Sequence, residues 1–370
     1  MKRIIVTGGH LTPALAVIKK LQEEGGWQIL FIGRKHTMEG DRGLSVESQI
    51  IPKLGIDFTS ISAGRIQRRF AIRYFLPAIL KVPLGFFQSF YYIEKFHPDV
   101  ILSFGGYLAV PVVLAGWLLG IPIITHEQSV LPGLATRFIS LFAKKIAVSW
   151  KETLKYLSKK KSIFTGNPIR GEILKITHTP CPVPHTPTIY ITGGNQGAHV
   201  INEVVRKCLP ELLKKYRIIH QCGMVGYYQD WEKLDAGRCT LDANLKKRYR
   251  LQRWFDSQEA ADILTKADLV ISRAGANIVY ELAFLGKPAI FIPLPSGREQ
   301  LINAKKLVRV GLAEILPQSK LTIKSLILSI ESLMRNLGKY QKEGKQAEKL
   351  VRPDAVEKLI GEVKKCLKEG

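Results

Sequence analysis

The residues with the clearest chemical potential lie in one segment, 268–293. Its pattern predicts a strand (269–272), a glycine turn, a helix (276–285) and a second strand (289–292). A strand that leads directly into a helix presents the first helical N–H groups and the positive end of the helix dipole, and both favour a phosphate. Glu281 lies about one and a half turns into that helix, where a carboxylate can accept hydrogen bonds from two ribose hydroxyls. The segment indicates a nucleotide site, although an ordinary βαβ unit with a solvent-facing Glu281 explains the same pattern.

Two further strands end in the same three residues, Thr-Gly-Gly, at 7–9 and 192–194. Each triplet follows an apolar strand and precedes a helix, and His10 follows the first of them directly. The strand at 121–125 ends in the polar residues 126–129. Ligands of doubly wound sheets bind at the carboxyl ends of parallel strands. We therefore predict two Rossmann-like halves facing a central cleft, with coincidental glycine turns as the alternative.

The length of 370 residues and an apolar content of 46% predict two domains with a core each. We expect an N-terminal Rossmann-like domain that binds acceptor and membrane at 1–165 and a proline-rich linker at 166–187. A C-terminal Rossmann-like domain is expected at 188–350 and a final helix at 351–370.

Charge and cysteine content indicate which partners the protein binds and which cellular compartment it occupies. The net charge of +24 indicates a polyanionic partner: an anionic membrane face, a phosphorylated substrate or RNA. The five cysteines are scattered without a CxxC pair, which favours a cytosolic protein over a disulfide scaffold. We expect no signal peptide, and glycine and proline divide the uncharged stretch 100–126 into buried α/β elements.

The segment 64–92 differs from the rest of the chain in composition, because cationic residues are interleaved with aromatic ones. Such a pattern suits a segment that lies on an anionic bilayer, with apolar side chains inserted and cations at the headgroups. A core helix with a solvated basic face is the alternative. The expected membrane residues are Arg65, Arg68, Arg69, Arg73, Phe86 and Phe87.

Taken in order, the motifs resemble those of the MurG family, the UDP-N-acetylglucosamine transferases that act on the lipid-linked muramyl-pentapeptide of peptidoglycan synthesis. The resemblance extends from residue 1 to about residue 310, and the glycosyltransferase B fold is what it implies. It also implies a peripheral enzyme at the cytoplasmic face of the cell membrane. The matching segments are TGGH (7–10), PALA (13–16), FGGY (104–107), HEQS (126–129), GNPIR (166–170), TGGNQGA (192–198), SRAGA (272–276), Glu281 and 300–303.

The resemblance also implies individual roles. Glu281 would bind the ribose hydroxyls, the backbone near Phe255 the uracil, and Gln300 the sugar hydroxyls. Arg170 suits the diphosphate because a guanidinium forms bidentate bonds with phosphate. His10 is the expected catalytic base, unless it caps the following helix or only holds the acceptor. The expected donor-binding residues are Thr7, Gly8, Gly9, Ser129, Arg170, Asn195, Phe255, Ala276, Asn277, Ile278, Val279, Tyr280, Glu281 and Gln300.

The chain departs from the family pattern at several motifs. Its first glycine loop is shorter, Ser129 replaces an asparagine, and Asn195 replaces a serine. Glu299 and Gln300 stand where the family has paired glutamines, so only Gln300 carries a role over.

The implied reaction is an inverting transfer, in which an acceptor hydroxyl attacks C1 of the sugar while UDP departs. The implied partners are UDP-N-acetylglucosamine, the undecaprenyl-linked muramyl-pentapeptide and an anionic membrane surface. No nucleic acid is expected. Because the sequence has no Asp-x-Asp motif, we expect no cofactor and no metal built into the site. A UDP-sugar epimerase, a transferase with another lipid-linked acceptor and a basic RNA-binding protein are the alternatives.

Overall fold

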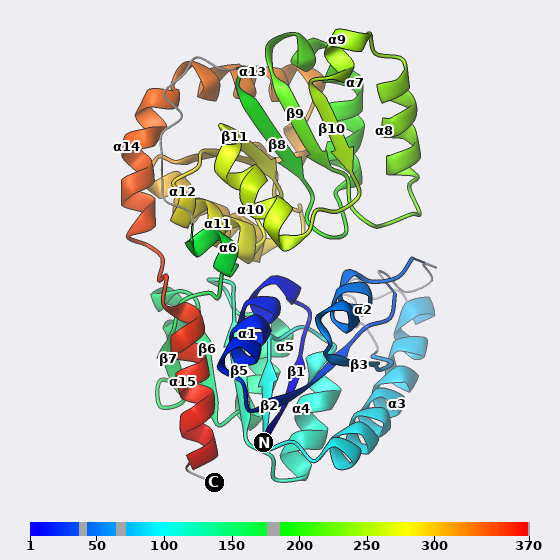
Figure 1. The fold of residues 1–370 in the computed structure, drawn as a ribbon, viewed down its shortest axis with the longest axis vertical. Coiled ribbons are helices and arrows are strands. Elements are labelled where there is room, and N and C mark those ends of the chain that lie inside the picture. The colour runs from blue at the N-terminus through cyan, green and yellow to red at the C-terminus, as the bar shows by residue number, and fades with distance from the viewer. Residues whose placement is uncertain (37–42, 64–71, 176–185, 369–370) are drawn as a thin grey trace. The chain divides into compact units, whose positions relative to one another are not determined.

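The computed structural model of the chain describes residues 1–36, 43–63, 72–175 and 186–368. Its residues form two compact α/β units (Figure 1). Unit 1 contains Met1–His36, Leu44–Ile169 and the C-terminal residues from Arg352, whereas unit 2 is built on Arg170–Val351. The prediction of two parallel α/β domains is confirmed.

Unit 1 has, within its described residues, a seven-stranded parallel sheet in the order β3-β2-β1-β4-β5-β6-β7. Helices α3, α4 and α5 pack side by side, and α1 packs against α15 (Figure 1). Its elements are β1 (Lys2–Thr7), α1 (Leu11–Glu24), β2 (Trp27–Gly33), α2 (Val46–Ile50), η1 (Pro52–Leu54), β3 (Asp57–Ser60), α3 (Ile72–Phe96), β4 (Val100–Ser103), α4 (Ala109–Leu118), β5 (Ile123–Glu127), α5 (Leu134–Phe142), β6 (Lys145–Val148), η2 (Lys151–Lys155), β7 (Ser162–Phe164) and α15 (Ala355–Lys368).

Unit 2 has, in the part of the chain that is described, a six-stranded parallel sheet in the order β10-β9-β8-β11-β12-β13. Its elements are α6 (Gly171–Leu174), β8 (Thr188–Thr192), α7 (His199–Lys215), β9 (Arg217–Gln221), α8 (Asp230–Cys239), α9 (Ala243–Lys246), β10 (Tyr249–Gln252), α10 (Ser257–Lys266), β11 (Leu269–Ser272), α11 (Ala276–Leu285), β12 (Ala289–Phe291), α12 (Arg298–Arg309), β13 (Ala313–Ile315), η3 (Gln318–Lys320), α13 (Ile323–Arg335) and α14 (Leu337–Glu348).

The core of each unit follows from its parallel sheet. The central strands of unit 1 are apolar along their length because helices cover the sheet, and Ile5, Ile101 and Ile123 are almost completely buried. Helices α4 and α5 contribute Val112 and Ile139 to the same cluster. This packing fixes the carboxyl ends of the strands, where the predicted site residues lie.

Several elements differ from the sequence predictions. The sequence predicts that residues 144–148 close the first sheet, but β7 extends the sheet beyond them. It also predicts an irregular stretch after the strand at 217–221, where the structure has α8 and α9. Strand β5 continues through His126 and Glu127 instead of ending before them. The sequence predicts a strand at 250–255, but β10 ends at Gln252, before Phe255. The final helix α15 packs against α1 and β4, which makes it part of unit 1.

Within the described residues, no helix combines the length and the apolar character that a membrane span requires.

Candidate active site

Helix α11 begins at the carboxyl end of β11 and presents its first N–H groups there. Its N-cap is Gly275, which has no side chain to accept a hydrogen bond from the first turn. The N–H of Val279 donates to the carbonyl of Gly275 at 3.2 Å. The amides suited to an anion are therefore those of residues 276–278. The resemblance implies amides from residues 276 through 280, but the N–H of Val279 is engaged within the helix, and the role of Tyr280 stays a prediction.

Glu281 of α11 forms a buried ion pair with Arg170, which lies 111 residues earlier in the chain. Arg170 Nε donates to Glu281 Oε1 at 2.8 Å, and Glu281 is only 1% exposed. Burial alone would lower the pKa of Arg170, but the charge and the hydrogen bond of Glu281 raise it above its ordinary value. The alternative of a solvent-facing Glu281 is thus excluded. The two residues assigned separately to ribose and diphosphate form a single charged unit.

Phe255, the residue expected near the uracil, packs against Tyr190, and the charges of the Arg170–Glu281 pair act on that tyrosine. Phe255 is buried in the loop after β10, and its ring packs edge-on against Tyr190 with centroids 6.3 Å apart. The guanidinium of Arg250 lies over the Phe255 ring at 4.8 Å. Burial raises the pKa of Tyr190 to about 12, and the charges of Arg170 and Glu281 also act on its hydroxyl. Sequence reasoning missed Tyr190, and its one signal was a tyrosine between the two isoleucines of the strand.

Two other predicted donor residues take part in loop structure. The carbonyl of Asn195, in the glycine loop after β8, accepts a hydrogen bond from the N–H of Met224 at 3.0 Å. The side-chain oxygen of Gln300 accepts from the N–H of Leu294 at 3.0 Å, so a role at the sugar falls to its NH₂ group. Asn303 Nδ2 donates to Ala274 O at 3.5 Å and links α12 to the turn before α11.

The first glycine loop of unit 1 packs directly on the loop after β4. Gly8 has φ +139°, and a Cβ there would lie 2.8 Å from the carbonyl carbon of Phe104, so no other residue fits. The N–H of Gly9 donates to Gly105 O at 3.0 Å. Thr7 is fully buried, and its hydroxyl donates to Ile32 O at 2.9 Å. The Thr7 hydroxyl therefore belongs to the sheet and is not available to a ligand.

His10 and His126 lie at strand ends of unit 1. Burial and the charge of Arg34 lower the pKa of His10 to about 4, so its ring is neutral near physiological pH. His10 occupies the N-cap position of α1, but its side chain forms no cap hydrogen bond with the described residues of that helix. The alternative role as a helix cap is therefore wrong.

His126 is completely buried, and its two hydrogen bonds define its tautomer. Nε2 donates to Gly166 O at 2.9 Å, and Nδ1 accepts from Gln128 Nε2 at 3.1 Å. Burial lowers the pKa of His126 to about 4. Glu127 beside it accepts from the N–H of Ser129 at 2.8 Å. His126 and Glu127 thus shape the loop that carries Ser129, whose side chain is partly exposed.

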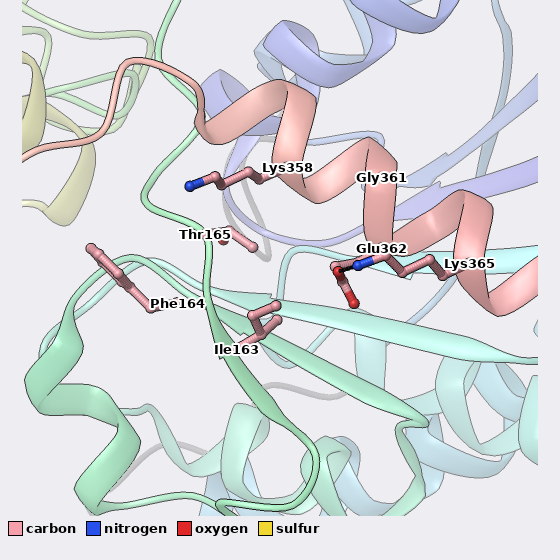
Figure 2. Close-up of a pocket in the computed structure, with 7 residues that line it drawn as sticks. All are labelled: Ile163, Phe164, Thr165, Lys358, Gly361, Glu362 and Lys365. Atoms are coloured by element: carbon pink, nitrogen blue, oxygen red, sulfur yellow. Dashed lines mark hydrogen bonds and ion pairs between the residues drawn. The ribbon is translucent and has the colours of Figure 1, made fainter.

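A cavity of about 270 Å³ lies elsewhere in unit 1, between β7 and α15 (Figure 2). Ile163, Phe164 and Thr165 form one wall, while Lys358 and Lys365 project from the helix. None of the predicted site residues lines it.

The predicted membrane residues differ in whether the structure describes them and in which way their side chains face. Arg65, Arg68 and Arg69 lie outside the described residues, and Arg73 lies in the first turn of α3, where the structure describes the backbone. Phe86 packs against the apolar core, whereas Phe87 is 68% exposed. The prediction for Phe86 is therefore corrected: this ring faces the core and Phe87 faces outward.

Comparison with known proteins gives matches along the whole chain. The glycosyltransferase family 28 N-terminal domain matches residues 4–148, and the C-terminal domain of the same family matches residues 188–359. A UDP-N-acetylglucosamine–N-acetylmuramyl-(pentapeptide) pyrophosphoryl-undecaprenol N-acetylglucosamine transferase of Bacillus cereus is 40% identical over 355 residues, covering 92% of this chain and 94% of that protein. The transferase of the same name from Clostridium botulinum is 36% identical over 353 residues, covering 92% and 93%.

Solved structures agree with these matches. MurG of Acinetobacter baumannii superposes with a TM-score of 0.68 at 29% identity, over 99% of this chain and 100% of that chain. A UDP-GlcNAc 2-epimerase from Neisseria meningitidis has a TM-score of 0.61 at 15% identity, over 99% and 100%, and shares the fold alone.

These similarities show the class of protein. The two parallel α/β units are those of a glycosyltransferase with the B fold, as the sequence predicted. The extent of the match then identifies the family. The chain belongs to glycosyltransferase family 28 and, within it, to the MurG family.

Proposed function

We propose that the chain transfers N-acetylglucosamine from UDP-N-acetylglucosamine to undecaprenyl-linked N-acetylmuramyl-pentapeptide, the conversion of lipid I to lipid II in peptidoglycan synthesis. The observation that carries the proposal is the match of both units, nearly end to end, to transferases named for this activity. The chemistry of unit 2 supports it, because a helix start, a carboxylate and a guanidinium suit a nucleoside diphosphate.

The donor would bind to unit 2 through α11 and its ion pair. The amides of residues 276–278 would hold the diphosphate and stabilise the negative charge that departs with UDP. Glu281 would accept hydrogen bonds from the ribose hydroxyls. Arg170 shares a hydrogen bond with that carboxylate, so its guanidinium would lie between the ribose and the phosphates and bind phosphate oxygens. Phe255 would present its backbone to the uracil.

His10 is our candidate for the group that takes the proton from the acceptor hydroxyl. Its ring is neutral near physiological pH and can accept a proton, although a pKa of about 4 makes it a weak base in the unliganded chain. An anionic acceptor bound beside the ring would raise this pKa towards neutrality. A role in holding the acceptor is the alternative.

We also propose that unit 1 binds an anionic membrane surface from the cytoplasmic side, without spanning the bilayer. Helices α3, α4 and α5 pack side by side and expose large apolar side chains. Phe87 and Tyr91 lie one helical turn apart on α3, and the rings of Trp117 and Phe138 both contact Phe142. Apolar side chains at such a surface insert among the lipids, while the cations of the segment 64–73 would meet the headgroups.

Incubation with radiolabelled UDP-N-acetylglucosamine, with and without the lipid-linked acceptor, tests the reaction. We expect one equivalent of UDP for each lipid-linked disaccharide, and sugar transfer only when the acceptor is present. Formation of an epimeric UDP-sugar without acceptor would favour the epimerase that shares this fold. Equal transfer to a lipid-linked sugar that lacks the pentapeptide would favour a different acceptor.

A further inference from the structure

Gln221 is the last residue of β9 and lies between two loops of the proposed donor site. In the sheet, β9 is flanked by β8 and β10. Strand β8 is followed by the glycine loop, residues 193–198, and β10 by the Phe255 loop, residues 253–256. Because the three strands are parallel, both loops emerge at the edge of the sheet where β9 ends. Gln221 therefore stands at the one strand end that borders both loops.

The side-chain amide of Gln221 forms hydrogen bonds with both loops. Nε2 donates to Gly194 O in the glycine loop at 3.0 Å, and Oε1 accepts from the N–H of Phe255 at 3.2 Å. The hydroxyl of Tyr190 donates to the same oxygen at 3.3 Å. Gln221 is only 5% exposed, so these contacts are shielded from water. One side chain thus connects the glycine loop, the Phe255 loop and the tyrosine beside the Arg170–Glu281 pair.

The two loop contacts require an amide. Gly194 offers a carbonyl and needs a donor, whereas Phe255 offers an N–H and needs an acceptor. A carboxamide supplies both at once, and a carboxylate supplies only acceptors. An aliphatic side chain of similar size would leave a buried carbonyl and a buried N–H without this partner.

The remaining contacts between the loops do not depend on this side chain. The backbone N–H groups of Gly223 and Met224 donate to Arg253 O at 2.9 Å and to Asn195 O at 3.0 Å. Gly223 also packs so closely on Gly197 that a Cβ on Gly223 would lie 2.2 Å from the Gly197 Cα. The backbone therefore keeps the loops attached, while the amide of Gln221 sets the positions of the Gly194 carbonyl and the Phe255 N–H.

We propose that Gln221 is a positioning residue for the donor nucleotide, which holds the Phe255 loop and the glycine loop at the spacing that a uridine diphosphate requires. This inference rests on the proposed function, because the uridine and sugar roles of Phe255 and Asn195 belong to it. Gln221 acts through the two loops and not by touching the reacting atoms. Its loss weakens donor binding while the chemical step is retained.

The test compares Gln221→Leu with Tyr249→Phe in the full-length protein. Tyr249→Phe removes the hydroxyl that bonds His220 Nδ1 at 3.0 Å, a buried hydrogen bond at the opposite end of β10 from the Phe255 loop. Calorimetry with UDP and thermal melting are carried out on both variants. We expect Gln221→Leu to weaken UDP binding about tenfold, and Tyr249→Phe to leave it unchanged within about twofold, although both lower Tm. The KM for UDP-N-acetylglucosamine should rise about tenfold in Gln221→Leu, with kcat changed by less than about threefold.

A second variant, Gln221→Glu, keeps the experiment decisive if Gln221→Leu does not fold. A protonated carboxyl can donate to Gly194 and accept from Phe255, whereas the ionised form cannot donate. UDP affinity relative to the wild type should therefore be about tenfold reduced near pH 8 and recover near pH 5. A ratio to the wild type that is constant across this range would overturn the proposal.

The outcomes separate the two levels of inference. If the wild-type chain does not bind UDP, the proposed function fails and the role of Gln221 fails with it. If the wild type binds UDP and Gln221→Leu binds it equally well, only the positioning role is overturned. Equal loss of UDP affinity in Gln221→Leu and Tyr249→Phe would also overturn it, because the effect would then follow general destabilisation.

Discussion

The first described strand of each unit ends in a threonine that two glycines follow, but the two threonine hydroxyls have opposite roles. In unit 1, Thr7 Oγ1 donates to Ile32 O at 2.9 Å and joins β1 to β2. In unit 2, Thr192 Oγ1 accepts from the N–H of Gly194 at 3.0 Å and shapes the glycine loop itself. The same Thr-Gly-Gly sequence thus gives a threonine hydroxyl that contacts the sheet in one unit and the loop in the other. What decides between them is the neighbouring strand and loop, which the motif does not contain.

The charges of the two units differ in a related way. The strand ends of unit 1 carry His10 and His126, which burial keeps neutral. The proposed site in unit 2 carries the charged pair Arg170–Glu281. This contrast agrees with the proposed roles. Unit 1 would accept a proton and bind a lipid surface, and unit 2 would bind an anionic nucleotide.

The first prediction tests whether membrane binding belongs to unit 1 alone. Replacing the four arginines of the proposed surface by glutamine should weaken binding to anionic vesicles by up to about a thousandfold, because each cation near such a surface contributes about 1 kcal/mol. Sedimentation with vesicles at low and high salt measures the change. The arginines are Arg65, Arg68, Arg69 and Arg73.

A matched control removes the same charge from α14 and its C-cap residue in unit 2, and it should leave vesicle binding nearly unchanged. Equal losses in both variants would show that only net charge matters. Phe87→Ser tests the apolar component, with Tyr227→Ser as its control because Tyr227 is an exposed aromatic residue of unit 2. The control lysines are Lys339, Lys342, Lys345 and Lys349.

The second prediction concerns the stability of unit 1 in acid. The pKa of His126 is 6.5 in a model peptide and about 4 in the fold, so between these values the unfolded chain binds a proton that the folded chain excludes. Its contribution is fully present above pH 6.5 and is lost as the pH falls towards 4, by about 3 kcal/mol in total. Urea unfolding across this range should show a shallower loss in His126→Gln.

His97→Gln is the control for this measurement, because His97 is an exposed histidine of the same unit. An unchanged slope in His126→Gln would show that His126 titrates in the fold as it does in the unfolded chain.

The third prediction sharpens the contrast in proton chemistry. His10→Ala should lower kcat by roughly a hundredfold or more, because the acceptor hydroxyl would lose its proton acceptor. The affinity for UDP-N-acetylglucosamine should stay near the wild-type value, and the acid limb of the kcat–pH profile should disappear. A variant that retains both turnover and pH profile would leave His10 with a structural role.

The fourth prediction uses two ion pairs of the same geometry. Arg170–Glu281 in unit 2 and Arg34–Glu47 in unit 1 both join Nε to Oε1 at 2.8 Å. Glu281→Ala should weaken UDP-N-acetylglucosamine binding about tenfold or more, because its hydrogen bonds to the ribose are lost. Glu47→Ala should lower Tm while donor affinity, measured by calorimetry, is retained. Unchanged affinity in folded Glu281→Ala would remove Glu281 from the site.

Sequence patterns predicted those strands and helices that are determined by residues adjacent in the chain. The strand at 269–272 was predicted to the residue, because its apolar run is bounded by Asp268 and Arg273. Strand β7 was missed because its three residues carry no periodicity and follow a run of lysines. The extension of β5 through His126 depends on the carbonyl of Gly166, forty residues away, which satisfies the buried ring.

The candidate site shows the same limit. The start of α11, whose free amides suit an anion, could be predicted, since a strand, a glycine turn and a helix are consecutive in sequence. The pairing of Arg170 with Glu281 could not, because it joins residues 111 positions apart. The amide of Gln221 was equally invisible, since its partners come from the loops after two other strands.

The C-terminal helix has a consequence for the order in which the protein forms during synthesis. Helix α15 packs against α1 and β4, and Lys364 at its exposed side pairs with Glu24 at 2.7 Å. In the chain, α15 follows all the described strands of unit 2. During synthesis the sheet of unit 2 can therefore assemble before α15 is available to cover α1. The unit that comes second in the chain can thus complete its sheet while the first unit still lacks one of its helices.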